Sequence, residues 1–118
     1  MVIKTIIWHN PKCSKSQQAL ELLIKGNVIP KIRLYLQDPP SKNEIREVLS
    51  ILKLNAIDIV RKTEVEFKSL NPNILRNEEL LIEILTKNPI LIERPIVLLG
   101  KKALIARPPS LIKNFIKY

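Results

Sequence analysis

The sequence predicts an α/β fold in which helices pack on a mixed β-sheet and a helical segment is inserted between its two halves. Apolar stretches of strand length occur at 2–8 and 30–36, and again at 95–99 and 103–105. Helical periodicity dominates the chain between them, over about residues 40–90. These two observations place strand, helix and strand before the insertion, and two strands and a helix after it.

Local pattern predicts the first strand and helix. Residues 2–8 are apolar and rich in β-branched side chains and end at an Asn-Pro turn, which predicts a buried strand. A helix is expected directly afterwards, because apolar residues recur at helical spacing over 19–24. Ser14 or Ser16 is its expected cap, and Gly26 is expected to end it.

The second strand is expected over residues 30–36. Ile32, Leu34 and Leu36 occupy alternate positions there, a pattern typical of a strand with one buried face. We therefore expect these three side chains to point into the core.

The inserted segment is predicted to be helical throughout. Ser41 and Glu44 have the spacing of a capping box, and apolar residues follow at helical spacing. Residues 56–60 predict a short helical turn, and Asn77 opens another helix that must stop before Pro89. The apolar stripe of the first inserted helix comprises Ile45, Val48, Leu49 and Leu52.

The last third of the chain predicts a β-hairpin and a final helix. Residues 95–99 and 103–105 flank a Gly100-Lys101 turn, and Pro108-Pro109 starts the helix. Its expected inward residues are Leu111, Ile112, Phe115 and Ile116.

This order of elements is that of a thioredoxin-like fold, β-α-β and then β-β-α around a mixed sheet, with an inserted helical subdomain. A chain of 118 residues suits one domain, so we expect a single domain over 1–118 with the insertion at about 40–90. In that fold the reactive cysteine lies where the first strand meets the first helix.

Composition narrows the cellular setting. No signal peptide and no apolar run long enough to span a bilayer is evident, so we expect a soluble, cytoplasmic protein without membrane partners. A single cysteine cannot form an internal disulfide, which favours a free thiol in a reducing compartment. The net charge of +9 is spread along the chain with only five aromatic residues, so nucleic-acid binding is not expected.

Cys13 is the candidate catalytic residue. It stands at the predicted strand-to-helix turn, where free backbone N–H groups and the helix dipole favour the thiolate. Its neighbours are polar and basic, which argues against a buried structural thiol. His9 lies four residues earlier and is either an exposed turn residue or a group that gives a positive charge or a hydrogen bond near the thiolate. We expect Ser14 and Ser16 to support the thiolate with His9.

Other chemistries of a lone cysteine fit less well. One cysteine and one histidine cannot supply a zinc site, so no metal is expected. A phosphatase loop of the C-x5-R type is excluded by Ala19 at the arginine position. The spacing from Cys13 to Ser16 is C-x-x-S, so a second sulfur must come from outside the chain.

Five separated segments, in order along nearly the whole chain, resemble those of the glutaredoxin- and glutathione-dependent arsenate reductases, the ArsC-like proteins of the wider ArsC/Spx group. The segments are His9–Ser16, Leu34–Leu36 with Pro39-Pro40, Val60–Lys62, Asn88–Val97 and Ala106–Pro109.

The resemblance implies roles that the residues alone would not indicate. Arg61, Arg94 and Arg107 correspond to the family's oxyanion-binding arginines, and Pro95 to a structural cis-proline. Planar, permanently charged guanidinium groups suit an oxyanion such as arsenate and would also favour a Cys13 thiolate. Gln17 departs from the pattern, because many relatives carry an arginine there.

The implied enzyme is an arsenate reductase with no bound cofactor. Cys13 attacks arsenate or a related oxyanion with loss of water, glutathione attacks the adduct, and glutaredoxin clears the mixed disulfide as arsenite leaves. The resemblance is also compatible with another natural substrate, either a different oxyanion or a glutathionylated species. The alternative is a non-catalytic regulatory module of the Spx type that binds a protein such as RNA polymerase.

Overall fold

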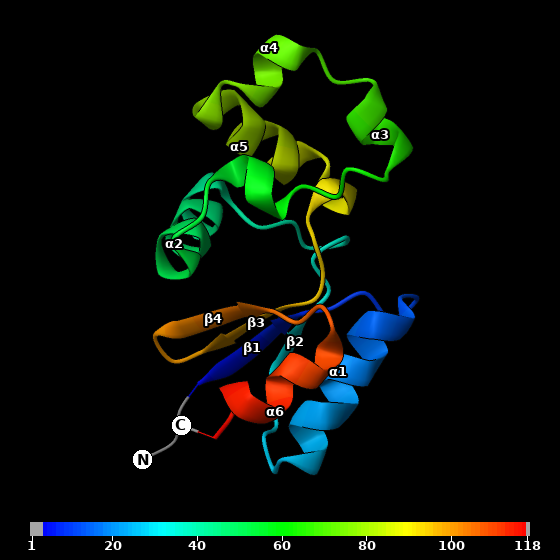
Figure 1. The fold of residues 1–118 in the computed structure, drawn as a ribbon, viewed down its shortest axis with the longest axis vertical. Helices are drawn as coiled ribbons and strands as arrows, with labels where there is room; N and C mark the ends of the chain where they lie inside the picture. The colour runs from blue at the N-terminus through cyan, green and yellow to red at the C-terminus, as the bar shows by residue number, and fades with distance from the viewer. Residues whose placement is uncertain (1–3, 118) are drawn as a thin grey trace. The chain divides into compact units, whose positions relative to one another are not determined.

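The computed structural model describes residues 4–117, and Figure 1 shows its ribbon. The chain divides into two compact units. The sheet unit consists of the described residues within Met1–Asp38 and Arg94–Tyr118, and the helical unit consists of Pro39–Glu93. No helix in the described part of the chain is long and apolar enough to cross a membrane.

The sheet unit is a four-stranded mixed sheet with helices packed on it, the thioredoxin-like arrangement. The strand order is β2-β1-β3-β4, with β1 parallel to β2 and antiparallel to β3, and β3 antiparallel to β4. Ile7 in β1 pairs with Ile32 on one side and with Val97 on the other. Its elements are β1 (Thr5–Trp8), α1 (Ser14–Lys25), β2 (Lys31–Arg33), β3 (Ile96–Leu99), β4 (Lys102–Ile105), the 3-10 turn η3 (Pro109–Leu111) and α6 (Ile112–Phe115).

The core of the sheet unit lies between the sheet and the α1/α6 pair, which lie side by side in Figure 1. Removal of apolar side chains from water is the main force that holds such a layer together. Gly26 ends α1 as predicted, and its small size matters because a Cβ there would overlap the side chain of Ile116. The central buried side chains are Ile7, Ala19, Leu23, Val97, Ala106 and Ile112.

Of the two strands predicted in the first half, the first is tested only in part and the bounds of the second are wrong. The first strand is described from Thr5 to Trp8, and Val2 and Ile3, which were predicted to belong to it, lie outside the described residues. The second strand is only Lys31–Arg33, because the amides of Gln37 and Asp38 bond to the carbonyl of Leu34 and turn the chain.

The turn also reverses the predicted buried face of this segment. Ile32 is 46% exposed and Leu36 is 36% exposed, whereas Tyr35, predicted to face outward, is fully buried. Alternation predicts burial only while a segment remains a strand, and β2 is an edge strand that ends before Leu34.

The C-terminal prediction is largely confirmed. The hairpin of β3 and β4 has the expected turn, in which Gly100 adopts a left-handed φ of 60°. After Pro108-Pro109 the chain enters η3 and then α6. Ile112 is buried and Phe115 and Ile116 pack on the core, but Leu111 is 42% exposed and does not face inward.

The helical unit packs around α5, which contacts α2, α4, η1 and η2. The predicted capping box is present: Ser41 Oγ accepts from Glu44 N, and Glu44 Oε1 accepts from Ser41 N. Asn77 caps α5 through Leu80 N, also as predicted. The elements are α2 (Lys42–Leu52), η1 (Ala56–Ile59), α3 (Val65–Lys68), α4 (Pro72–Leu75), α5 (Glu78–Lys87) and η2 (Pro89–Leu91).

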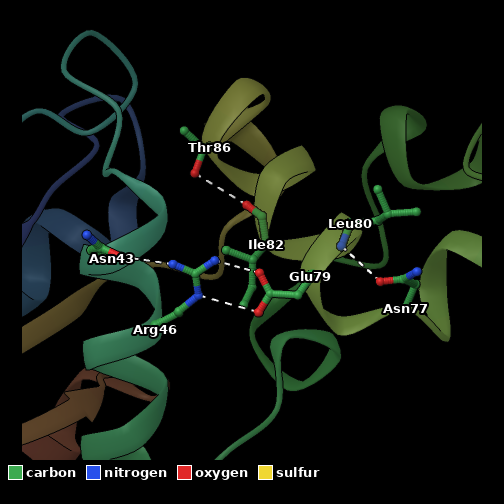
Figure 2. A network of polar contacts seen from close by, with 7 residues as sticks. All are labelled: Asn43, Arg46, Asn77, Glu79, Leu80, Ile82 and Thr86. Atoms are coloured by element: carbon green, nitrogen blue, oxygen red, sulfur yellow. Dashed lines mark hydrogen bonds and ion pairs between the residues drawn. The ribbon is translucent and has the colours of Figure 1, made fainter.

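A polar network joins α2 to α5 on the outside of the helical unit (Figure 2). Arg46 donates to both carboxylate oxygens of Glu79 and to Asn43 Oδ1. These hydrogen bonds lower the pKa of the Glu79 carboxyl. The side chains are exposed, so the apolar faces of the two helices, including buried Leu81, Ile82 and Leu85, contribute more to their packing.

Candidate active site

Cys13 is the N-terminal cap of α1 and is half-buried. Its backbone is extended, its amide donates to Asn10 O at 3.0 Å, and its carbonyl accepts from Gln17 N at 3.0 Å. The prediction that Ser14 or Ser16 caps this helix is therefore wrong. The chain turns at Asn10–Cys13 one residue earlier than expected, which places the thiol itself beside the first free amides of the helix.

The surroundings of Cys13 favour the thiolate. Burial raises the pKa of the thiol, but hydrogen bonds from Ser16 N, from the Arg94 side chain and from Lys15 N, together with the charge of Arg94, outweigh it. The net result is a Cys13 pKa below its ordinary value. The lowered pKa favours the thiolate, and Cys13 can therefore act as a nucleophile.

Arg94 and Arg107 come from the two ends of the β3/β4 hairpin in the sheet unit. The Nε and Nη1 atoms of Arg94 are buried, and its peptide bond to Pro95 is cis, the geometry implied by the resemblance. Arg107 is exposed and donates through Nη1 to Arg94 O at 3.0 Å. The guanidinium of Arg107 is thus held at the residue that contacts the thiol.

His9 is buried rather than exposed at a turn. It is only 5% exposed, and its Nδ1 lies 2.6 Å from Ser16 Oγ. Burial lowers the pKa of the imidazole, which favours the neutral form at pH 7 and argues against a positive charge near the thiolate. The exposed-turn interpretation is wrong, and a hydrogen bond from His9 in support of the thiolate stays a prediction.

Ser16 is fully buried and connects the helix to the end of β1. Its Oγ accepts from Asn10 N at 3.1 Å in addition to its contact with His9. Its side chain therefore bonds away from the sulfur, and its backbone amide is the group that reaches Cys13. Ser14 is exposed on the same turn, and its support of the thiolate stays a prediction.

Two residues that the sequence analysis did not place in the site shape the loop before Cys13. Asn10 accepts from Lys12 N through Oδ1 at 3.0 Å, as asparagine does in many turns. Gln17 donates from Nε2 to Pro11 O. The Asn-Pro pair was a sequence signal for this turn, but nothing in the sequence indicated that Gln17 would reach back to it.

Arg61 belongs to the helical unit. Its Nε lies 3.0 Å from Glu64 Oε1 and its Nη1 lies 3.7 Å from Glu93 Oε1. Only 14% of its side chain is exposed, so its charge is largely matched by these two carboxylates. A role of Arg61 toward an oxyanion at Cys13 stays a prediction.

Within residues 4–117, no three His, Cys, Asp or Glu side chains are grouped in a way that would hold a metal ion. The chemistry that the sheet unit does support is nucleophilic attack by Cys13, with Arg94 beside the sulfur to attract an anion. These features define a thioredoxin-like protein with a single reactive thiol and a basic site.

Comparison with known proteins identifies the family. The ArsC family model matches residues 8–115, so the chain belongs to the ArsC family. It is 41% identical over 112 residues to the Escherichia coli K12 protein YfgD, covering 93% of this chain and 94% of that one. It is 39% identical over 112 residues to an arsenate reductase of Haemophilus influenzae, covering 93% and 97%.

A solved structure agrees with this assignment. An arsenate reductase from Vibrio cholerae superposes with a TM-score of 0.84 at 31% identity and covers 98% of this chain and 100% of that one. The thioredoxin-like fold and the ArsC family predicted from the sequence are confirmed.

Proposed function

We propose that this chain is an arsenate reductase that uses Cys13 as its nucleophile. The observation that carries the proposal is the hydrogen bonding of the Cys13 sulfur by Ser16 N, Lys15 N and the Arg94 side chain, which favours a thiolate beside a fixed positive charge. Arsenate is a tetrahedral oxyanion, and an arginine next to a thiolate lets the anion approach a nucleophile of like charge. Relatives at 37–39% identity are named arsenate reductases, which supports the same substrate.

The first step leaves the oxidation state of arsenic unchanged. The Cys13 sulfur forms a bond to As(V), and one arsenate oxygen leaves as water after it is protonated. Two electrons must then come from thiols outside the chain, because the sequence holds a single cysteine. Overall, one arsenate and two glutathione molecules give one arsenite, one glutathione disulfide and one water. The first glutathione attacks the Cys13 sulfur of the adduct, so that arsenite leaves and a disulfide between Cys13 and glutathione forms. Glutaredoxin and the second glutathione then reduce this disulfide and return the Cys13 thiolate.

The arginines have separate parts in this proposal. Arg94 is the residue in contact with the sulfur, and it stabilises the thiolate before attack and the anion during it. Arg107 is held on the carbonyl of Arg94 and presents an exposed guanidinium on the same side of the hairpin. Arg61 is assigned to the oxyanion by family resemblance alone, and in the structure its guanidinium pairs with Glu64 and Glu93.

The test is a coupled assay of the purified chain with arsenate, glutathione and glutaredoxin, in which arsenite formation is measured directly. We expect turnover in the native protein and none in Cys13→Ser. Ser50→Ala is the control, because Ser50 is exposed in α2 of the helical unit and has no part in the site. Arsenite formation that persists in Cys13→Ser, or no formation with either thiol partner, would exclude the proposal.

The single free thiol also supports an intracellular, reducing setting, and we propose the cytoplasm on that ground. The alternative of an Spx-type regulatory module is not favoured, because the similar proteins from Haemophilus influenzae and Vibrio cholerae are named arsenate reductases. The C-x-x-S spacing also leaves the chain without the partner cysteine of a switch disulfide.

A further inference from the structure

A groove of about 370 Å³ lies between α1 and the start of the C-terminal helical segment in the sheet unit. One wall is formed by α1 and the other by Pro108, Pro109 and the turn into α6, which lie side by side in Figure 1. Its volume is within the range of small-molecule sites in proteins. The apolar floor is provided by Leu22 and Pro109, of which Pro109 is buried.

The rim of this groove carries an uneven set of charges. Lys15, Lys25 and Lys113 line it together with a single acidic residue, Glu21. All four side chains are exposed, and within residues 4–117 none of the four makes an ion pair with another residue. The groove therefore offers three cations and one anion to a ligand with the opposite arrangement.

One end of the groove is close in sequence to the reactive cysteine. Lys15, on its rim, is two residues from Cys13, and its backbone amide helps to lower the pKa of that thiol. Pro108, on the other wall, follows Arg107, which is bonded to the carbonyl of Arg94, the arginine that contacts the thiol. A ligand at the Lys15 end of the groove would therefore lie near Cys13.

We infer that this groove is the binding site for glutathione. Glutathione has two carboxylates, one ammonium group and a central thiol, which match the three lysines, Glu21 and the neighbouring Cys13. The inference rests on the proposed function only in taking glutathione as the outside thiol. A second pocket, of about 290 Å³, is lined by the loop before Cys13 and the segment after β2, but Lys12 is the only lysine or carboxylate residue that lines it, so it lacks this complementarity.

Calorimetric titration of the full chain with S-methylglutathione tests the inference without any redox chemistry. The variant is Lys25→Glu/Lys113→Glu, and Lys15 is left unchanged because its amide serves the thiol. We expect binding at least about 10-fold weaker than in the native protein, since two attractive contacts become repulsive. Lys31→Glu/Lys68→Glu is the matched control, with the same change of net charge at exposed lysines outside the groove, and should bind within about twofold of native.

A second double variant, Lys25→Gln/Lys113→Gln, controls for misfolding of the glutamate variant. The control is needed because Lys25 lies at the C-terminal end of α1, where a negative charge is unfavourable. It should weaken binding about 3- to 10-fold. Equal binding by the groove and control variants, or no binding by the native chain at millimolar ligand, would overturn the inference.

Kinetics then separate this inference from the proposed function. In the groove variants the KM for glutathione should rise about 10-fold, while the alkylation rate of Cys13 and the KM for arsenate stay unchanged. If the native chain binds S-methylglutathione but does not reduce arsenate, the proposed function is rejected and the inferred glutathione site is retained. A rise in the KM for glutaredoxin alone would overturn the inference and assign the groove to an acidic protein surface.

Discussion

Ser16 Oγ lies 2.6 Å from His9 Nδ1, and the backbone amide of the same serine helps to lower the pKa of Cys13. The contact ties the first turn of α1 to the end of β1, because Oγ also accepts from Asn10 N. Ser16 thus orients its own amide through a side chain that does not touch the thiol. The C-x-x-S spacing has a physical function here, although its fourth residue is not a resolving thiol.

Ser16→Ala should weaken this orientation and raise the pKa of Cys13. Loss of the hydroxyl frees the first turn, so its amide is held less closely to the sulfur, and the thiolate loses a donor. We expect the rate of alkylation by iodoacetamide at pH 7 to fall by about 3- to 10-fold. The pH profile of alkylation should move to higher pH. An unchanged profile, or an equal change in the exposed control Ser50→Ala of the helical unit, would contradict the link.

Arg94→Gln should raise the Cys13 pKa by removing both a hydrogen bond and a charge. Arg94→Lys keeps the charge but loses the planar fork, so its thiol reactivity should fall between the Gln variant and the native protein. We expect about a 10-fold loss of alkylation rate at pH 7 for Gln. The control is Arg76→Gln, an exposed arginine of the helical unit, which should leave the thiol unaffected.

Features set by residues close in sequence were predicted well. The capping box of Ser41 and Glu44 and the Gly100 turn depend on backbone groups within a few residues, so pattern alone identifies them. The face of 30–36 was predicted wrongly because it depends on where the strand stops pairing with its neighbour. Tyr35 is buried by a turn whose hydrogen bonds, from Gln37 N and Asp38 N to Leu34 O, have no sequence signature.

In the candidate site, too, local features were predicted from the sequence and contacts between distant residues were not. Cys13 was found from its position at a strand-to-helix turn, which is a local property. The contact of Arg94 with the thiol joins residues 81 positions apart, and family resemblance, not spacing, indicated it. The burial of His9 and its lowered pKa depend on the packing of the sheet unit, which the sequence around His9 does not indicate.

The neutral, buried His9 should make the folded state less stable in mild acid. Its pKa is lowered on folding, so the unfolded chain binds this proton more readily. Stability is therefore fully present above the ordinary histidine pKa of about 6.5 and is lost as pH falls toward the lowered value. Urea unfolding from pH 7.5 to 5.5 should show a decrease no steeper than about 1.4 kcal/mol per pH unit, the limit for one proton.

His9→Asn provides the comparison for that measurement. Asparagine presents an amide near the position of Nδ1 and does not titrate, and the sequence holds no other histidine. The decrease between pH 7.5 and 5.5 should therefore be smaller in the variant than in the native chain. Parallel curves for the two proteins would show that His9 does not carry this dependence.

Ser41→Ala should destabilise the helical unit without affecting the thiol. The substitution removes Ser41 Oγ, which accepts from Glu44 N. Of the two bonds in the capping box, only the one from Ser41 N to Glu44 Oε1 remains. Losses of this kind cost about 1 kcal/mol, and amide hydrogen exchange in α2 should quicken accordingly. Ser50→Ala, at an exposed position of the same helix, should be neutral or slightly stabilising because alanine has the higher helix propensity. Equal exchange in both variants would mean that the cap does not limit the opening of α2.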